Sequence, residues 1–192
     1  MNKNLLRVSA RLTRNIFHVN NKARQTEINN KISIDVYKII NKISKNKNIN
    51  ISGYYPINDE LDCTGILNNL KKYNDTFSFS LPVVKKNTRL LDFYVYDLDA
   101  SQLINGKYTK IPPIKCKVKP SIMLVPFLGF TDARYRLGYG GGYYDYTLEQ
   151  YGSNSISIGI GYDVQKIDNM PIDDHDIPLN YIVTESFIYH NQ

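Results

Sequence analysis

The chain has 192 residues, of which 42% are hydrophobic, and a formal net charge of +6. This length suits one compact domain and is short for two. The sequence contains no apolar run of about 18 residues, so no membrane-spanning helix is expected. Its only two cysteines, Cys63 and Cys116, make a disulfide framework or a cysteine zinc site improbable.

The positive charge gathers at the start of the chain. Residues 1–50 hold eleven Lys or Arg against two acidic residues, whereas the remainder holds thirteen against sixteen. Such a block indicates a nucleic acid, an anionic membrane surface or an anionic small substrate, or simply a solvated helical face. The first twenty residues lack the apolar core of a secretory signal. Their Arg-rich, acid-poor composition resembles that of an organelle transit peptide, but a helix of the mature protein is favoured. The small number of cysteines fits a cytoplasmic location.

Two helices are predicted before the first strand. Residues 4–17 carry apolar side chains at close to helical spacing, namely Leu5, Val8, Leu12 and Ile16. A second stripe predicts a helix over residues 26–44: Ile28, Ile32, Val36, Ile39, Ile40 and Ile43. A linker, KNKN at 45–48, follows.

Strands and helices alternate from residue 49 onward. Strands are predicted in the segments 48–55, 76–82, 90–98, 121–128, 155–162 and 182–189, and helices over 65–73, capped by Asp62 or Thr64, and 143–151. The continuous apolar run SIMLVPFL at 121–128 is typical of a strand buried on both faces. These patterns predict a single α/β domain over residues 1–192, with a central, mostly parallel sheet and helices on both faces.

The most informative stretch follows the buried strand. It brings together Arg136, four glycines between 138 and 142, a helix start at Tyr143 and an acid, Asp145. Glycines let the backbone approach a ligand closely, a helix N-terminus offers free N–H groups, Arg can grip phosphate in a bidentate manner, and Asp suits Mg²⁺. Neither the GxxxxGK[ST] nor the GxGxxG phosphate motif is present, and three adjacent glycines can also form a plain flexible turn.

The string RLGYGGGYYD at 136–145 resembles the signature of the 5-formyltetrahydrofolate cyclo-ligase family, also called 5,10-methenyltetrahydrofolate synthetases. Companion segments occur in the same order: Lys3-x-x-Leu6-Arg7, YYPINDELD at 54–62, LVPFLGF at 124–130 and GYDVQKIDNMPIDDHDIPLNYIVTE at 161–185. Residues 71–120 contribute little. The resemblance implies a three-layer fold similar to the NagB/RpiA/CoA transferase-like fold.

Three positions depart from the family pattern. An FDxxG turn usually precedes RLG, but here Arg134 stands in place of its glycine. Ser121 and Asn180 stand where the family often has aspartates.

The resemblance also implies a reaction. ATP would phosphorylate the formyl oxygen of 5-formyltetrahydrofolate, turning it into a good leaving group, and N10 would attack to close the ring, with release of ADP and phosphate. ATP and Mg²⁺ are the implied cofactors, and the folate is the implied small-molecule partner. A monomer without a nucleic-acid or membrane partner is expected.

Site residues carry over by matched position. The implied nucleotide-binding residues are Lys3, Arg7, Arg136, Leu137, Gly138, Tyr139, Gly140, Gly141, Gly142, Tyr143 and Tyr144. The implied folate-binding residues are Tyr55 and Glu60, with Tyr139, Gly140, Gly141, Gly142 and Tyr143. Asp145 and Asp176 would share Mg²⁺, and Arg136 and Tyr143 would act at the reacting groups.

Blander interpretations remain open. Lys3 and Arg7 can be two solvated charges, Arg136 half of a structural ion pair, Asp145 and Glu60 acids at helix starts. His175 is given no acid–base role. Alternative functions are a nucleic-acid-binding module using the basic N-terminal helices, an ATP-independent isomerase or transferase, or an inactive relative of the family.

Overall fold

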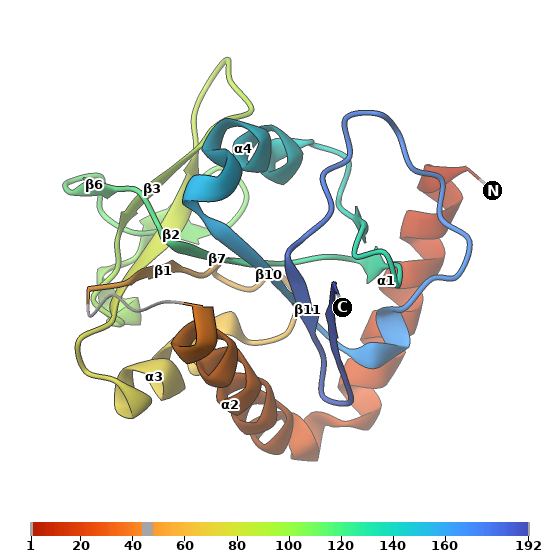
Figure 1. The fold of residues 1–192 in the computed structure, drawn as a ribbon, viewed down its shortest axis with the longest axis horizontal. Coiled ribbons are helices and arrows are strands. Elements are labelled where there is room, and N and C mark those ends of the chain that lie inside the picture. The colour runs from red at the N-terminus through yellow and green to blue at the C-terminus, as the bar shows by residue number, and fades with distance from the viewer. Residues whose placement is uncertain (1, 44–47, 192) are drawn as a thin grey trace.

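The computed structural model describes residues 2–43 and 48–191. An eight-stranded sheet with strand order β12-β11-β10-β7-β1-β2-β3-β6 forms its centre (Figure 1). The five neighbouring strands from β11 to β2 are parallel, whereas the β11–β12, β2–β3 and β3–β6 pairs are antiparallel. This confirms the predicted α/β class with a mostly parallel sheet.

The sheet strands are β1 (Asn50–Ser52), β2 (Ser78–Val84), β3 (Leu91–Val95), β6 (Lys117–Val118), β7 (Ile122–Val125), β10 (Ile156–Ile160), β11 (Tyr181–Val183) and β12 (Ile188–His190). Two small hairpins pair β4 (Ile104–Asn105) with β5 (Lys110–Ile111) and β8 (Gly129–Phe130) with β9 (Arg136–Leu137). The α-helices are α1 (Lys3–Asn20), α2 (Gln25–Ile43), α3 (Cys63–Tyr73) and α4 (Tyr143–Tyr151). Short 3-10 turns are η1 (Lys22–Arg24), η2 (Ala100–Gln102), η3 (Gly152–Asn154) and η4 (Asp163–Gln165).

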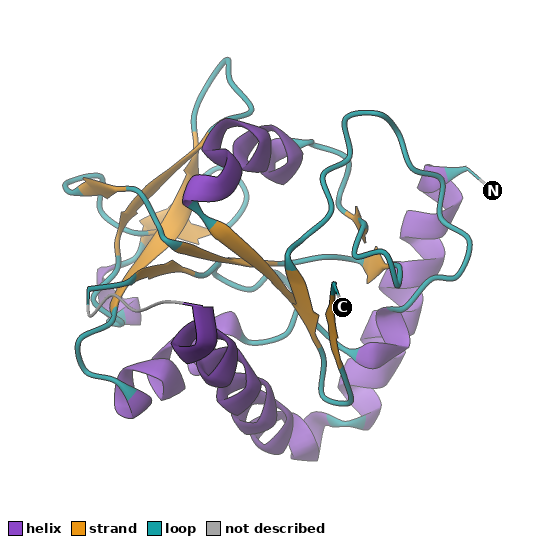
Figure 2. Cartoon of the chain, in the orientation of Figure 1, coloured by secondary structure: helices purple, strands orange, loops and turns teal. Residues whose placement is uncertain are grey.

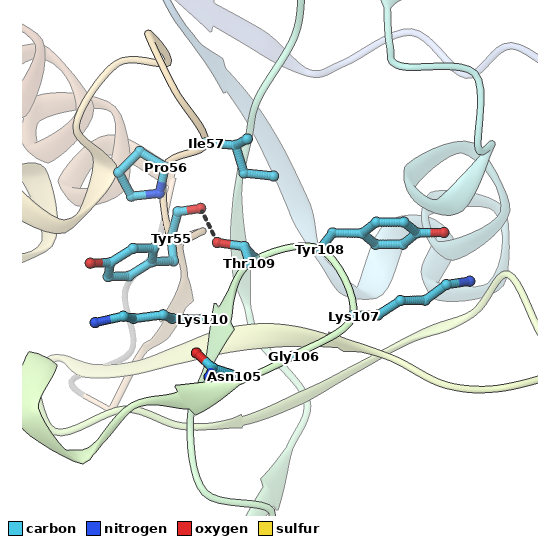
Figure 3. Close-up of a pocket in the computed structure, with 9 residues that line it drawn as sticks. All are labelled: Tyr55, Pro56, Ile57, Asn105, Gly106, Lys107, Tyr108, Thr109 and Lys110. Atoms are coloured by element: carbon cyan, nitrogen blue, oxygen red, sulfur yellow. Dashed lines mark hydrogen bonds between the residues drawn. The ribbon is translucent and has the colours of Figure 1, made fainter.

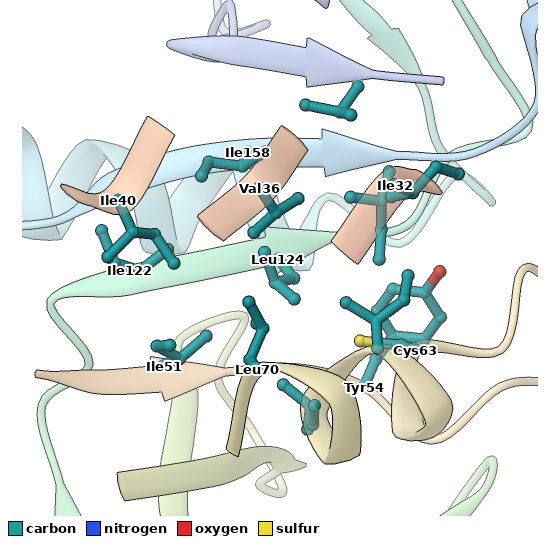
Figure 4. Close-up of a cluster of buried hydrophobic side chains, with 14 of the residues drawn as sticks. Ile32, Val36, Ile40, Ile51, Tyr54, Cys63, Leu70, Ile122, Leu124 and Ile158 are labelled. Atoms are coloured by element: carbon teal, nitrogen blue, oxygen red, sulfur yellow. The ribbon is translucent and has the colours of Figure 1, made fainter. Parts of the chain in front are cut away.

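Helices cover both faces of the sheet, as Figure 2 shows. Successive side chains of β7 point to opposite faces, and all four are buried. Ile122 and Leu124 join a core cluster with residues of α2 and α3 (Figure 4), whereas Met123 and Val125 pack in a second cluster with Leu148 of α4. The prediction from the continuous apolar run is therefore confirmed: β7 is a strand that is buried on both faces, between two cores.

Most predicted elements are confirmed to within a few residues. The α4 helix has the predicted bounds, and Asp62, not Thr64, caps α3 by accepting a hydrogen bond from the Gly65 N–H. Ser44 and positions 45–47 of the predicted linker lie outside the described residues. The single strand predicted at 182–189 is wrong in one respect, because Thr184 to Phe187 form a turn that separates β11 from β12.

The first helix is confirmed, but its apolar stripe does not face the core. Leu6, Ala10 and Arg14 are its buried residues. The residues that predicted the helix lie on the opposite side and are exposed: Leu5, Val8, Leu12 and Ile16.

The turn between β8 and β9 is built without the family's usual glycine. Arg134 adopts φ +66°, a left-handed conformation that glycine adopts freely and other residues rarely do. The Thr131 N–H donates to the Tyr135 carbonyl at 3.0 Å, and the Arg134 N–H donates to the Thr131 carbonyl at 2.8 Å. The Arg134 side chain also donates from Nε to the Leu179 carbonyl at 2.9 Å.

Two substitutions separate the backbone strain at Arg134 from its side-chain bond. Arg134→Ala and Arg134→Gly both lose the bond to Leu179, but only glycine relieves the left-handed backbone. We expect Arg134→Gly to be more stable than Arg134→Ala by about 1 kcal/mol. Urea unfolding of the two variants measures the difference, and an alanine variant at least as stable as the glycine variant would contradict the strain.

Candidate active site

One pocket of about 740 Å³ opens beside the glycine loop. It gathers side chains from α1, the segment after β1, the β2–β3 and β4–β5 connections, the glycine loop and the segment before β11. All fifteen residues that the family resemblance singles out line it: Lys3, Arg7, Tyr55, Glu60, Arg136, Leu137, Gly138, Tyr139, Gly140, Gly141, Gly142, Tyr143, Tyr144, Asp145 and Asp176. Sequence positions up to 173 residues apart thus meet in one place.

The glycine loop joins β9 to α4 along the pocket wall. Gly140 and Gly142 have φ angles of +98° and +66°, so a side chain at either position would be strained. Gly142 is the N-cap of α4 and offers no side chain to the first turn. The N–H groups at the start of α4 are therefore left for another acceptor at the positive end of the helix dipole.

Arg136 lies at the base of this loop and is buried. Its Nη2 is 2.8 Å from the Asp145 carboxylate, its Nη1 donates to the Ile177 carbonyl at 3.2 Å, and its guanidinium lies over the Tyr144 ring. Burial lowers the pKa of Arg136, and the Asp145 carboxylate opposes that shift. Arg136 thus forms the ion pair that the blander interpretation anticipated, at the edge of the pocket.

The first helix places two basic side chains, Lys3 and Arg7, at the mouth of the pocket. Lys3 Nζ contacts the carboxylates of Asp176 at 2.6 Å and Asp173 at 2.7 Å. Burial alone would lower the pKa of Lys3, but the hydrogen bonds to these two acids raise it overall. Arg7 donates from Nε to the Gly138 carbonyl at 2.9 Å, and its guanidinium lies against Gly140.

Glu60 forms the opposite wall and is 5% exposed. One carboxylate oxygen accepts from the Tyr139 hydroxyl at 2.6 Å, and the other accepts from the Ile57 N–H at 2.9 Å. The buried guanidinium of Arg14 lies 3.7 Å from Glu60 and forms two hydrogen bonds with Asp59. Tyr139 of the glycine loop therefore sits on the carboxylate that the resemblance assigns to the folate.

The carboxylates of the pocket suit a hard cation. Asp145 and Asp176 both line it, and Asp173, His175 and Asp176 offer ligand atoms within 4.8 Å of one another. Carboxylate oxygens beside a polyphosphate are the usual protein ligands of Mg²⁺. The donor set fits Mg²⁺ once Lys3 and Arg136 release the two acids. Sequence reasoning did not include Asp173 or His175 in this group.

No sequence motif predicts that segment 71–120 contributes to the pocket, yet several of its residues line it. Arg89, between β2 and β3, points toward the glycine loop: a Cβ on Gly142 would lie 3.6 Å from its Nη1. Among the described residues Arg89 has no ion-pair partner. Arg89 belongs to no motif, because it is a single arginine in a polar loop, KKNTR at 85–89. It comes to lie beside the glycine loop only through the order of the strands in the sheet.

The β4–β5 hairpin closes the far side. The Tyr108 hydroxyl lies 3.4 Å from that of Tyr143, and Thr109 donates to the Tyr55 carbonyl at 3.3 Å. A smaller pocket of about 370 Å³ adjoins it, with Lys107 and Lys110 in its wall (Figure 3). The hairpin thus places two more cations near the rim.

The family follows from comparison with known proteins. The sequence profile of the 5-formyltetrahydrofolate cyclo-ligase family matches residues 2–185. The chain belongs to this family. It is accordingly an enzyme.

Relatives named for the same activity are found among curated proteins. The chain is 29% identical over 147 residues to the 5-formyltetrahydrofolate cyclo-ligase of Haemophilus influenzae, covering 73% of this chain and 78% of that protein. The Escherichia coli K12 enzyme of that name is 33% identical over 69 residues, covering 35% and 38%.

Two solved structures have a similar fold. The 5,10-methenyltetrahydrofolate synthetase of Aquifex aeolicus superposes with a TM-score of 0.71 at 24% identity, covering 99% of this chain and 93% of that one. The Mycoplasma pneumoniae synthetase superposes with a TM-score of 0.70 at 24% identity, covering 96% and 99%.

Glu60 and Asp59 have pKa values that are shifted in opposite directions, so they make the stability of the fold depend on pH with opposite sign. Burial raises the pKa of Glu60, although hydrogen bonds from Tyr139 and Ile57 oppose the shift. A carboxyl with a raised pKa stabilises the fold fully below its ordinary pKa and less as the pH rises through its folded pKa. We therefore expect Glu60→Gln to gain stability relative to the unmodified protein as the pH rises from about 4 toward neutrality.

Asp59→Asn is the matched control. Burial alone would raise the pKa of Asp59, but the hydrogen bonds and charge of Arg14 lower it. Its stabilisation is present above the ordinary pKa and is lost as the pH falls through the lowered one, so this variant should be weaker at neutral pH and converge with the unmodified protein in acid. Thermal unfolding across a pH series tests both, and a Glu60→Gln difference that is independent of pH would contradict the assignment.

Proposed function

We propose that this enzyme converts 5-formyltetrahydrofolate into 5,10-methenyltetrahydrofolate, with ATP consumed and ADP and phosphate released, and with Mg²⁺ required. The observation that carries the proposal is the convergence of all fifteen family-matched residues on one pocket. That pocket has bases around an open helix start on one side and a buried carboxylate on the other.

The basic side supports a polyphosphate. Lys3, Arg7, Arg89, Lys107 and Arg136 all line the pocket. Together with the N–H groups of the glycine loop and of the first turn of α4, they would hold the triphosphate and neutralise charge that spreads during phosphoryl transfer. Tyr143, at the first position of α4, would border the reacting groups.

The carboxylate side supports the pterin. Glu60 can accept from the amino and ring N–H groups of a pterin, and Tyr55 would flank it. Since the Tyr139 hydroxyl and the Ile57 N–H hold Glu60 in place, the carboxylate is already oriented. The pocket would thereby align the formyl oxygen with the γ-phosphate, which is the main task of such an enzyme.

Asp145 and Asp176 would hold Mg²⁺, and the ion would supply positive charge that offsets the charge of a polyphosphate. In this structure Asp145 is paired with Arg136, and Asp176 with Lys3. Binding of nucleotide and metal is therefore an exchange, in which both bases move from carboxylate to phosphate.

The basic residues of α1 offer little to a nucleic acid. On α1, Lys3 and Arg7 point into the pocket, Arg14 is buried, and Arg11 lies over the Tyr139 ring at 5.3 Å. A nucleic-acid surface needs such bases on a solvent-facing patch, so we favour the anionic small substrate.

A cytoplasmic location is also part of the proposal. Cys63 and Cys116 are both free thiols, which suits a reducing compartment. Among the described helices, none combines the length and apolar character needed to cross a bilayer.

The deciding experiment mixes the protein with 5-formyltetrahydrofolate, ATP and Mg²⁺ and follows methenyl absorbance. We expect product only when all three are present, together with one ADP per turnover. Product without nucleotide would favour the ATP-independent alternative, and no product under any condition would favour an inactive relative.

Arg89 tests the phosphate side without disturbing the buried ion pair. Removal of one charge-assisted contact costs about 1.5 kcal/mol or more, so Arg89→Ala should raise KM for ATP about tenfold. Lys86→Ala, on the same loop but outside the pocket lining, is the control and should leave KM unchanged. Equal effects of the two substitutions would show that general loop charge, not a contact, is responsible.

Lys3 tests the exchange of counter-ions, with Mn²⁺ as a paramagnetic substitute for Mg²⁺. Because Lys3 neutralises Asp176 and Asp173, the nucleotide-free protein should bind Mn²⁺ weakly, and Lys3→Gln should bind it at least about tenfold more tightly. Lys22→Gln, on η1, is the control. Electron paramagnetic resonance of free Mn²⁺ measures the binding, and unchanged affinity in Lys3→Gln would refute competition between the ammonium and the metal.

A further inference from the structure

The outer face of α1 exposes a continuous apolar stripe. Its five members are between 50% and 68% exposed: Leu5, Val8, Leu12, Ile16 and Val19. An 18-residue helix is about 27 Å long, and the stripe runs along most of it. Single exposed apolar residues are ordinary, but a contiguous row of this length marks an interaction surface.

The spacing of the stripe is symmetric about Leu12. Going along the chain, the intervals are three, four, four and three residues, an average of 3.5, which is the repeat that keeps an apolar seam facing a neighbouring helix. If two such helices pair antiparallel about a two-fold axis through Leu12, each member meets a member of the other copy. Val8 meets Ile16 of the partner subunit, and Leu5 meets Val19 of the partner subunit.

The polar residues beside the stripe obey the same symmetry. Ser9 and Asn15 flank the stripe at equal distances from Leu12, as do Asn4 and Asn20, and all four are uncharged and exposed. Arg11 is the only exposed Lys or Arg on the helix, and its guanidinium is turned onto the Tyr139 ring. No acid occurs on α1. Apart from Arg11, no exposed charge of α1 would therefore face a second copy.

We propose that α1 is a dimerisation helix, which pairs antiparallel with α1 of a second copy of this chain about a two-fold axis at Leu12. An isologous, self-complementary patch is what two-fold assembly requires. The pairing leaves the pocket open, because Lys3 and Arg7 project from the other side of the helix. It replaces the monomer expected from the family resemblance and does not depend on the proposed reaction.

A membrane surface fits the same helix less well. Helices that lie on a membrane carry Lys and Arg on the polar face, beside the headgroups. Here the polar face is turned into the protein, where Arg14 is buried and Lys3 is paired with Asp173 and Asp176. The residues that would meet headgroups are asparagines, a serine and one arginine, Arg11, whose guanidinium lies over the Tyr139 ring.

The size of the contact sets the expected strength. Stable interfaces bury roughly 1,200 Å² or more in total, and one pair of helices of this length reaches only the lower part of that range. We therefore expect a reversible dimer with a dissociation constant in the micromolar range.

Sedimentation equilibrium of the full chain over a wide range of concentration tests the proposal. We expect a monomer–dimer equilibrium in which Leu12→Glu, which sets two carboxylates together at the axis, weakens association at least about tenfold. Ile34→Glu, at an exposed apolar position of α2 outside the stripe, should leave it unchanged. Circular dichroism and thermal unfolding verify that these surface variants fold.

A charge pair tests the antiparallel register. Val8→Glu and Ile16→Lys should each weaken the dimer, and the double variant should recover it, because each introduced carboxylate would then face an introduced ammonium of the other copy. Failure of the double variant to recover would overturn the two-fold pairing. A protein that stays monomeric at all concentrations, or a dimer indifferent to Leu12→Glu, would overturn the proposal, as would a monomer that instead co-sediments with phosphatidylcholine–phosphatidylglycerol vesicles in a Leu12-dependent way.

Discussion

The buried guanidinium of Arg136 ties together three segments that are distant in the chain. It pairs with Asp145 of α4, donates to the carbonyl of Ile177 before β11, and lies over the ring of Tyr144. A buried charge is tolerated only when it is paired and hydrogen-bonded, and loss of one partner is costly. The planar, forked donors of arginine suit it to meet a carboxylate and a carbonyl at once. The start of α4, and with it the glycine loop, is therefore fixed relative to the acids at 173–176.

The same principle extends around the pocket, where each carboxylate already has a partner. Glu60 accepts from Tyr139, Asp176 is paired with Lys3, and Asp145 with Arg136. The carboxylates of the site are thus each compensated, which avoids the desolvation of an unpaired buried charge. An incoming polyanion and cation would take over these partners, so the net gain on binding is the difference between two paired states. This favours ligands that supply both charges together over either charge alone.

The elements that the sequence predicted well are those whose signal is local. The buried run of β7 and the helix after the glycines depend on burial on two faces and on a helix start within a few residues, and both were found. The split of 182–189 into β11 and β12 depends on Thr184, whose hydroxyl accepts from the Ser186 and Phe187 N–H groups in a tight turn. Periodicity alone does not reveal that turn.

Other features depend on contacts between distant segments. The fifteen pocket residues could be named because a family motif stands in for such contacts, whereas Arg89 has no motif and reaches the glycine loop only through the order of β2 and β3 in the sheet. Arg134 replaces a glycine at a left-handed position, and only the backbone shows that the turn keeps its shape. The apolar stripe of α1 predicted the helix but not which side of it faces the core. Periodicity identifies an apolar face of a helix but does not show what covers that face.

That helix connects the two surfaces of the protein. Its inner side buries only Leu6, Ala10 and Arg14, a narrow contact for an element of 18 residues, and yet it carries Lys3 and Arg7 at the pocket mouth. A second copy on its outer side would add apolar contact where the inner side provides little, and would restrict the motion of both bases. By thermodynamic linkage the effect is mutual: whatever holds Lys3 and Arg7 in place from within the pocket also favours pairing of the outer faces. An exposed stripe on this helix is therefore positioned to act on the site without touching it.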